Sequence, residues 1–346
     1  MNDDFQLLSH YDLATWPEWG SAPRRPLIDC DMAHKGELLD TVVGPDPKTK
    51  QARIYHILRC ELCIITHAWP LPSSEDLSRY YADTFYQVDK TEYVDRYEAD
   101  RAWWEQCVHG PILEQCRDLL LQTENVSFLE IGAGPGIALD VAQKVFGWKT
   151  SAFEPNGTLC EALRHRGHIV EQGVLEDFCA GQFPGEIFQH SIVYLYEVLE
   201  HQPNPEDFLL QCWDHLRPGG LLAITVPNDY SPTQLQAQQI LKIDPWWLAP
   251  PQHLHYFTPK TLQLVIRRAG FQILDMRGTY PLDQHLLLDQ NYIGNDALGR
   301  HLHQERMQLE LSDLHHGRWL NRESQYRDNM KRRVGREIVA IARKPL

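Results

Sequence analysis

The sequence is short of positive charge. It contains 33 Lys and Arg residues against 47 Asp and Glu residues, which gives a formal net charge of −14. Binding to a phosphate backbone or an anionic membrane depends on Lys and Arg neutralising those charges, so neither nucleic acid nor a membrane is expected as a partner. Hydrophobic residues at 43% and charged residues at 23% are ordinary for a globular protein, so the composition does not indicate a disordered or fibrous chain.

The N-terminus lacks the features of an export signal. It reads Met1-Asn2-Asp3-Asp4, with acids where a signal peptide has basic residues, and no apolar run approaches the roughly 20 residues that span a bilayer. We therefore expect a cytoplasmic protein. In that compartment the eight cysteines are not expected to form disulfides, so clustered cysteines indicate metal ligands and scattered ones indicate core residues.

Internal repeats and low-complexity tracts are also missing, but the composition changes along the chain. Prolines interrupt the first 72 residues, where short strands are expected at 53–58 and 62–66. We predict five parts: an irregular N-terminal module at 1–72, a helical linker and cap at 73–125, an α/β core at 126–277, a helical insertion at 278–334, and a last core strand at 335–346.

The core alternates apolar strands with helices. Strands are expected at 126–131, 150–153, 168–171, 187–194, 221–226, 271–276 and 336–343, and helices at 205–216, at 259–269 and after Gly136 and Gly157. Apolar strands that alternate with helices imply a parallel sheet with helices on both faces. The predicted fold class is therefore a doubly wound α/β sheet, with the helical insertion placed before its last strand.

Three alternate glycines, Gly132, Gly134 and Gly136, lie between the first core strand and its helix. Glycine lets the backbone approach a ligand closely, and ligands bind at the carboxyl ends of the strands in such sheets. The dinucleotide fingerprint G-x-G-x-x-G has a different spacing, and Glu130 would repel pyrophosphate but attract an amino group and a sulfonium. Glu154, directly after the second strand, could accept both ribose hydroxyls. The pattern favours a cationic nucleoside cofactor; the alternative is a tight turn without a ligand.

Five ordered motifs, at 130–136, 153–155, 196–201, 216–220 and 251–258, resemble those of class I S-adenosylmethionine-dependent methyltransferases. The similarity is to the branch with ubiquinone-type and zinc-containing sugar C-methyltransferases. It implies a seven-stranded Rossmann-like sheet that binds S-adenosylmethionine. By this resemblance the methionine end is held by Glu130, Gly132, Gly134 and Gly136, the ribose by Glu154 beside Pro155, and the adenine edge by Leu175 and Glu176, while Tyr196 and Glu197 lie under the sulfonium.

Methyl transfer often requires that a proton be removed from the accepting atom, and histidine is the natural base at neutral pH. His253 and His255 lie on a loop after the fifth strand of the core, and relatives carry a histidine near the acceptor there. We predict His253 as the general base and His255 as the next candidate; the alternative is that they only fix the loop. Trp246 and Tyr256 could wall the acceptor pocket or fill the core.

A second resemblance concerns the N-terminal module. Cys30-x3-His34 and Cys60-x2-Cys63 form two close pairs of the ligand types that tetrahedral zinc requires. They resemble the zinc-ribbon-like module of the sugar C-methyltransferases, with His34 in place of a cysteine. We predict one structural zinc; the alternative is buried free cysteines.

The expected function is methyl transfer from S-adenosylmethionine to a small polar acceptor such as a sugar, a nucleotide sugar or another secondary metabolite. The alternative is a catalytically inactive protein that binds the cofactor for regulation or interaction. The insertion could cap the active site or form a homodimer contact. Its basic end at 331–336 could bind an acidic group of the acceptor. Alternatively, these cations could simply stabilise the C-terminal end of a helix through the helix dipole.

Overall fold

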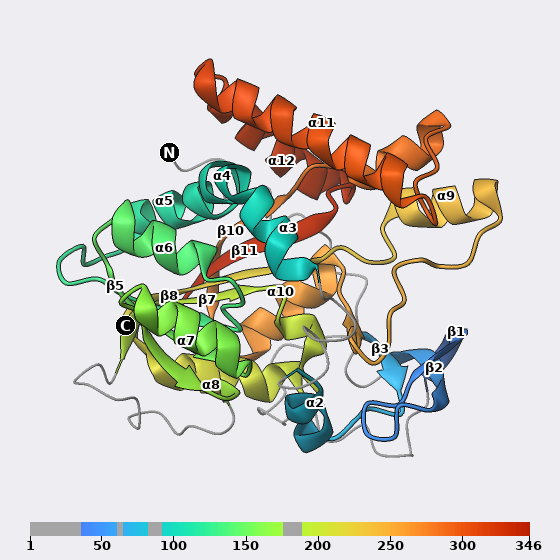
Figure 1. Ribbon diagram of the computed structural model, residues 1–346, viewed down its shortest axis with the longest axis horizontal. Coiled ribbons are helices and arrows are strands. Elements are labelled where there is room, and N and C mark those ends of the chain that lie inside the picture. The colour runs from blue at the N-terminus through green and yellow to red at the C-terminus, as the bar shows by residue number, and fades with distance from the viewer. Residues whose placement is uncertain (1–35, 61–64, 82–91, 176–188) are drawn as a thin grey trace.

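The computed structural model describes residues 36–60, 65–81, 92–175 and 189–346, which form two β-sheets surrounded by helices (Figure 1). The larger sheet has seven strands: β4 (Ser127–Ile131), β5 (Lys149–Glu154), β6 (Ile169–Gln172), β7 (His190–Tyr196), β8 (Leu216–Pro227), β10 (Gln272–Gly278) and β11 (Glu337–Arg343). Its strand order is β10-β11-β8-β7-β4-β5-β6. The sequence predicted all seven strands, with boundaries that differ by a few residues.

The sheet is mixed, so the prediction of a parallel sheet is wrong for the last strand. Strands β4 to β8 pair in parallel, whereas β11 is antiparallel to both β8 and β10. The cause is the helical insertion, which returns the chain to the end of the sheet at which β10 finishes. Thr279, directly after β10, donates its backbone N–H to Glu337 at the start of β11, so β11 must run back along β10.

Helices cover both faces of this sheet, as predicted. On one face α8 (Pro205–His215) and α10 (Pro259–Arg268) bury Phe208, Leu262 and their neighbours against the strands. On the other face the helices are α5 (Gly110–Leu119), α6 (Ile137–Lys144) and α7 (Gly157–His165). Side chains of Asn204 and Thr258 cap α8 and α10, which explains where those helices begin.

The segment before the core is helical but not one continuous helix. It contains α2 (Ser74–Tyr80), α3 (Tyr93–Ala99), α4 (Arg101–Trp103) and the π-helix η3 (Trp104–His109), which runs directly into α5. A proline such as Pro111 would interrupt the interior of a helix. Pro111 instead lies in the first turn of α5, where a missing N–H costs little, and the irregularity is the π-helix before it.

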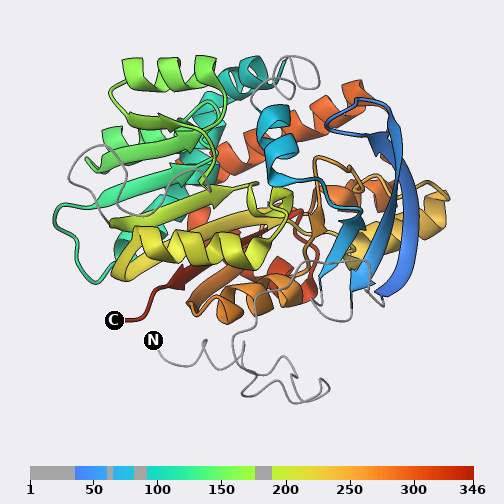
Figure 2. The ribbon, with the colours of Figure 1, turned by 90° about the horizontal axis from the view of Figure 1, so that it is seen from below.

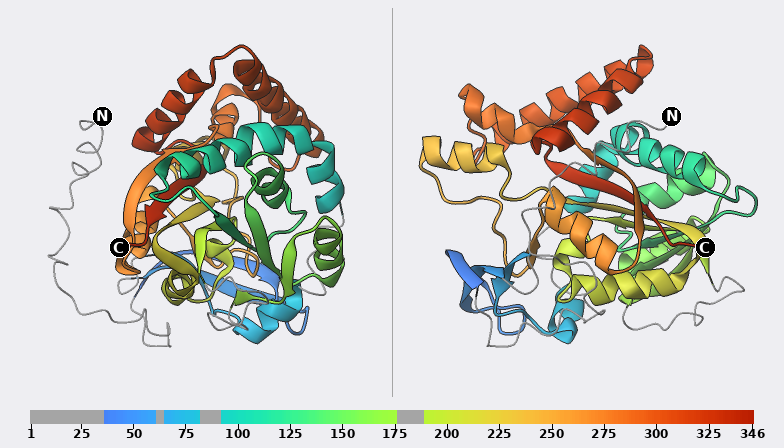
Figure 3. Two further views of the ribbon diagram at one scale, coloured as in Figure 1. Left: turned by 90° about the vertical axis from the view of Figure 1, so that its left-hand side faces the viewer. Right: turned by 180° about the vertical axis from the view of Figure 1, so that it is seen from behind.

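The insertion before β11 is helical, with η6 (Leu282–Leu288), α11 (Asp296–His315) and α12 (Trp319–Arg332) lying along the outside of the molecule (Figure 3). Buried polar contacts attach α11 to the π-helix region: the indole of Trp103 donates to Glu310 at 2.6 Å, and Arg306 lies over the Trp103 ring. At the basic end of the insertion, Arg336 lies 4.0 Å from Asp229 and 3.9 Å from Asp283, so internal carboxylates already face this cation.

The smaller sheet is antiparallel and lies apart from the core sheet at one end of the molecule (Figure 2). Its order is β1 (Gly36–Pro45), β2 (Ala52–Cys60), β3 (Thr66–Trp69) and β9 (His255–Tyr256). The sequence predicted β2 but neither β1 nor β9. Of the four predicted zinc ligands, Cys30, His34 and Cys63 lie outside the described residues, and Cys60 is buried at the end of β2.

Five scattered cysteines were expected in the core. Cys107, Cys116, Cys160 and Cys212 are buried, and Cys179 lies outside the described residues. Within the described ranges no helix is both long enough and apolar enough to cross a bilayer.

Candidate functional site

A cavity of about 980 Å³ opens at the carboxyl ends of β4, β5 and β7, where ligands bind in open α/β sheets. Its glycine-turn side is formed by residues 130–135, 153–155 and 173–175. Its histidine side is formed by Tyr81, by α3 and η3, by the segments at 201–202 and 252–253, and by the start of α11. Residues 196–198, the last residue of β7 and the two that follow it, lie between the two sides. The cavity thus joins a backbone turn to a set of titratable side chains.

The glycine turn has a conformation that requires glycine. Gly132, Gly134 and Gly136 have φ angles of +70°, +51° and +72°, in the region that L side chains rarely adopt. A Cβ on Gly132 would come within 2.9 Å of Val198 Cγ2 and would fill the space next to the cavity. Gly136 has another role, because a Cβ there would meet Leu163 Cδ2 at 2.1 Å. It allows α6 to pack on α7 and does not line the cavity.

Two buried acids face the cavity beside this turn. Glu154 accepts hydrogen bonds from the backbone N–H groups of Gly134 at 2.8 Å and Asn156 at 2.9 Å, and burial raises its pKa to about 7. Burial also raises the pKa of Glu130 well above its usual value, and one of its carboxylate oxygens has no hydrogen-bond partner among the described residues. A buried carboxyl oxygen without a partner is costly. The turn therefore fits a ligand that brings a positive charge to Glu130 and hydroxyl donors to Glu154.

The other residues predicted to contact the cofactor lie as follows. Pro155, Leu175, Tyr196 and Glu197 all line the cavity, and Glu176 lies outside the described residues. Every predicted cofactor residue in the described part of the chain except Gly136 therefore lines the cavity, on the glycine-turn side or between the two sides. The spacing of these residues along the sequence was enough to predict that they lie together, because β4, β5 and β7 are adjacent strands that end at the same edge of the sheet.

The sequence analysis did not find the aromatic wall on the histidine side. Tyr97 stacks on Trp104 with ring centroids 4.3 Å apart, and the Trp104 ring meets the ring of Tyr196 edge to face at 5.7 Å. Trp104 and His109 are the first and last residues of the π-helix and both line the cavity. Its wider turn is the feature that brings these side chains to one wall, and π-helical turns often occur at functional sites. Hydrophobic periodicity does not reveal such a turn.

Residues of the helical insertion form the rim of the cavity on its histidine side. Arg300 on α11 donates two hydrogen bonds to the Asp100 carboxylate, at 2.5 and 2.7 Å, and His303 lies 3.5 Å from that carboxylate. These contacts join α11 to the end of α3 across the rim. The insertion therefore forms part of the cavity wall.

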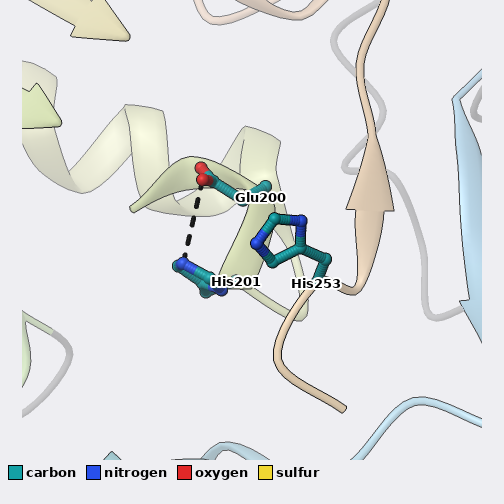
Figure 4. Close-up of side chains that lie close together, drawn as sticks. All are labelled: Glu200, His201 and His253. Carbon is teal, nitrogen blue, oxygen red and sulfur yellow. Dashed lines mark ion pairs between the residues drawn. The ribbon is translucent and has the colours of Figure 1, made fainter. Parts of the chain in front are cut away.

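His253 lies on the histidine side, next to Glu200 and His201 of η5 (Leu199–His201) (Figure 4). The rings of His201 and His253 are 5.1 Å apart and approach edge to face. His201 donates from Nδ1 to the backbone carbonyl of Gln252, and its Nε2 lies 3.7 Å from a carboxylate oxygen of Glu200. Burial lowers the pKa of His201 to about 4 and raises that of Glu200 well above its usual value. Neither His201 nor Glu200 was among the predicted site residues.

Backbone bonds on both sides hold the loop that carries His253. Leu254 donates its N–H to the carbonyl of Glu200 at 2.9 Å and accepts from Ala68, which follows His67 in β3, at 2.8 Å. The side-chain amide of Gln252 donates to the hydroxyl of Tyr80 at 3.0 Å. The N-terminal sheet thereby fixes the position of His253.

The structure does not bring His255, Tyr256 and Trp246 to the cavity lining. His255 is buried in β9, where its Nε2 donates to the carbonyl of Pro203 at 3.3 Å, and burial lowers its pKa to about 3. Tyr256 is fully buried against Tyr55 and Trp247, and Trp246 packs on the same cluster. Pairing with β3 accounts for this, because it places His255 and Tyr256 inside the smaller sheet.

Comparisons with known proteins agree with this geometry. A family model described as "Methyltransferase domain" matches residues 108–275. The ubiquinone biosynthesis O-methyltransferase of Roseobacter denitrificans is 25% identical over 222 residues, which cover 55% of this chain and 86% of that protein. The corresponding enzyme of Pseudomonas aeruginosa is 29% identical over 182 residues, 48% of this chain and 75% of that protein.

Solved structures are more distant. A S-adenosylmethionine-dependent methyltransferase from Archaeoglobus fulgidus is 15% identical, covers 69% of this chain and 94% of its own, and has a TM-score of 0.42. A plantazolicin methyltransferase, solved in complex with S-adenosylhomocysteine, is 14% identical, covers 78% of this chain and 94% of its own, and has a TM-score of 0.46.

Proposed function

Residues 108–275 are a class I S-adenosylmethionine-dependent methyltransferase domain, and from this premise we propose that the chain methylates a small polar acceptor bound on the histidine side of its cavity. The methionine end of the cofactor binds at Glu130, Gly132 and Gly134. Its ribose binds Glu154 beside Pro155, and its adenine lies along Leu175 and Glu176. Tyr196 and Glu197 then lie beneath the sulfonium, between the two sides.

The chemistry of the two buried acids, Glu130 and Glu154, supports this orientation of the cofactor. The unpartnered Glu130 oxygen provides an acceptor for the ammonium group of the methionine end. Each Glu154 oxygen already accepts one backbone N–H and keeps a second lone pair for a ribose hydroxyl. A pyrophosphate would instead bring negative charge to two buried carboxyls, so a dinucleotide is disfavoured.

The histidine side supports a small acceptor. A cavity of about 980 Å³ lies at the upper end of the usual size for a ligand site, which leaves room for a second molecule beside the cofactor. Its wall combines the aromatic rings of Tyr97 and Trp104 with polar groups at Arg300, His303 and His253. His253 is the residue we assign to drawing the proton from the accepting atom.

The observation that carries the proposal is that His253 and the Glu130–glycine–Glu154 constellation line one continuous cavity. The test is turnover of methyl-labelled S-adenosylmethionine with separate panels of phenols, sugars and nucleotide sugars. Label should appear in one acceptor class together with S-adenosylhomocysteine. Tight cofactor binding with no transfer to any panel would favour the alternative of a regulatory protein.

The N-terminal module would hold a structural zinc at Cys30, His34, Cys60 and Cys63. The support is the spacing of the four ligands and the position of Cys60 at the end of β2, a strand of the sheet that fixes the His253 loop. Such a zinc would stabilise the module without taking part in methyl transfer.

A further inference from the structure

We propose that the acceptor is a small organic cation, an amine that binds in its protonated form and is methylated on nitrogen. The inference rests on the proposed function, since it concerns the molecule bound on the histidine side of the cavity. Two features of that side carry it. The residues that line it have an excess of negative charge, and aromatic rings lie among them.

Acidic residues outnumber basic ones around the acceptor. Once Glu130 and Glu154 are assigned to the cofactor, four acids and two arginines remain among the described residues that line the cavity. The acids are Glu92, Asp100, Glu197 and Asp296, and the arginines are Arg96 and Arg300. This excess of negative charge repels a phosphate or a carboxylate and attracts a cation.

Both arginines are already bound to acids. Arg96 donates a hydrogen bond to Glu92 at 2.8 Å, and Arg300 donates two hydrogen bonds to Asp100. A guanidinium that recognises a phosphate or a carboxylate of a ligand uses the same N–H groups. An anionic acceptor would therefore have to compete with Glu92 or Asp100, and the arrangement disfavours nucleotide sugars.

Three histidines on this side do not offset the negative charge. Burial lowers the pKa of His109 to about 3 and that of His201 to about 4, and it also lowers the pKa of His303. These rings are therefore uncharged at neutral pH. They provide hydrogen bonds to an acceptor without repelling a cation.

Two of the acids are placed to receive a cation. Asp296, the first residue of α11, is exposed at the rim, and its carboxylate has no hydrogen bond or ion pair with another described residue. Glu197 lies between the two sides of the cavity with a backbone φ of +52°, a region that L side chains rarely adopt. Its N–H donates to the carbonyl of Thr225 at 2.9 Å. Backbone strain of this kind is concentrated at functional sites.

Aromatic rings accompany these carboxylates. Tyr97, Trp104 and Tyr196 all line the cavity. The faces of such rings carry partial negative charge, so they attract an organic ammonium group. A neutral sugar would gain nothing from this attraction or from the excess of acids. The combination of rings and carboxylates therefore fits an amine better than an uncharged acceptor.

Methyl transfer to an amine needs a base, because a protonated nitrogen has no lone pair. His253, the base of the proposed function, takes one proton from the ammonium group and releases it to water. The nitrogen lone pair then forms a bond to the methyl carbon of S-adenosylmethionine. The bond from that carbon to sulfur breaks, and its electron pair stays on sulfur as the thioether of S-adenosylhomocysteine. The product is an N-methylammonium ion, so positive charge moves from sulfur to nitrogen.

The test gives the full-length protein methyl-labelled S-adenosylmethionine and a panel of amines, each matched by the alcohol and the carboxylate of the same carbon skeleton. Label should appear in an N-methylated amine. With S-adenosylhomocysteine present, calorimetry should show that this amine binds at least about tenfold more tightly than its alcohol or its carboxylate. Asp296→Asn should weaken binding of the amine by about threefold to fivefold and leave binding of the alcohol unchanged.

Asp289→Asn is the matched control, because Asp289 is an exposed aspartate of the same insertion that does not line the cavity. Binding of S-adenosylhomocysteine by each variant shows that the domain is folded. The proposal is overturned, with the proposed function intact, if label enters sugars or phenols but no amine. It is also overturned if the carboxylate binds as tightly as the amine, or if the two aspartate variants change amine binding equally. Absence of transfer to every class would instead count against the proposed function.

Discussion

The carboxylate of Glu154 accepts a hydrogen bond from the backbone N–H of Gly134 at 2.8 Å. This contact ties the end of β5 to the turn after β4, so the acid and the glycines form one preorganised unit. Glu154 is also held by the N–H of Asn156, which caps α7. The proposed ribose site is therefore built into the junctions of two strands with their helices.

We predict that the protein binds S-adenosylmethionine or S-adenosylhomocysteine tightly and does not bind NAD. Glu154→Ala should weaken cofactor binding by about 1–3 kcal/mol, because the ribose hydroxyls lose their acceptor. Calorimetry with both ligands measures this. Equal affinity for NAD would refute the cofactor assignment.

Binding of adenosine should depend on pH through Glu154. Burial raises the pKa of this carboxyl to about 7, so below that pH it carries a proton and has fewer lone pairs for the ribose. Affinity should rise by about tenfold between about pH 6 and about pH 8 and then level off. Adenosine is the suitable probe because it has no amino group to interact with Glu130. In Glu154→Gln the profile should be flat; a steep profile in that variant would assign the titration to another group.

Gly132→Ala should reduce cofactor affinity and stability together. The added Cβ would come within 2.9 Å of Val198 Cγ2 at a backbone φ of +70°. Gly147→Ala is the matched control, because Gly147 has a φ of +69° but nothing within 4 Å of the added atom. The control measures the backbone strain alone, by thermal unfolding. If both variants bind S-adenosylhomocysteine equally well, the close approach at Gly132 has no role in the site.

Replacing the two loop histidines should have different effects. His253→Ala should lower kcat by about 10²–10⁴-fold while leaving affinity for S-adenosylhomocysteine nearly unchanged, because His253 lines the cavity on the side away from the proposed cofactor site. His255→Ala should mainly lower the thermal midpoint, since His255 is buried and bonded to Pro203. Steady-state kinetics with the identified acceptor decide the matter. A larger loss of kcat in His255→Ala than in His253→Ala would reverse the assignment.

We predict one zinc per chain at Cys30, His34, Cys60 and Cys63. Four ligands of this type close a structural site, and loss of the metal should destabilise the N-terminal module. Metal analysis of protein purified without added metal, before and after the double change Cys60→Ser and Cys63→Ser, tests the site. If the double variant still binds zinc and still shows thiolate absorption, other cysteines hold the metal.

Much of the core could be predicted because its information is local. Each strand is an apolar run bounded by turn residues, and Gly132, Glu130 and Glu154 lie within a few residues of strand ends, where topology brings them together. The direction of β11 could not be predicted in this way. It depends on where α11 and α12 return the chain, which is a property of tertiary packing.

The histidine side depends on long-range contacts and was therefore only partly predictable. His253 was found from its loop, but β9 has only two residues and forms by pairing with β3, nearly 190 positions earlier in the chain. That pairing is what withdraws His255 and Tyr256 from the cavity. Glu200 belongs to one of the motifs that carry the family resemblance, yet only the structure shows that its buried carboxyl oxygens have no hydrogen-bond partner among the described residues.

The pairing of β3 with β9 also limits how this protein can be engineered. Thr66 pairs with Tyr256 and His67 with His255, so the last strand of the smaller sheet is encoded in the methyltransferase domain. A chimera that took residues 36–72 from a relative would inherit a sheet edge matched to a different partner strand. Exchange of acceptor specificity between relatives should therefore require the N-terminal sheet and the 250–257 loop to be exchanged together, although the two segments lie far apart in the sequence.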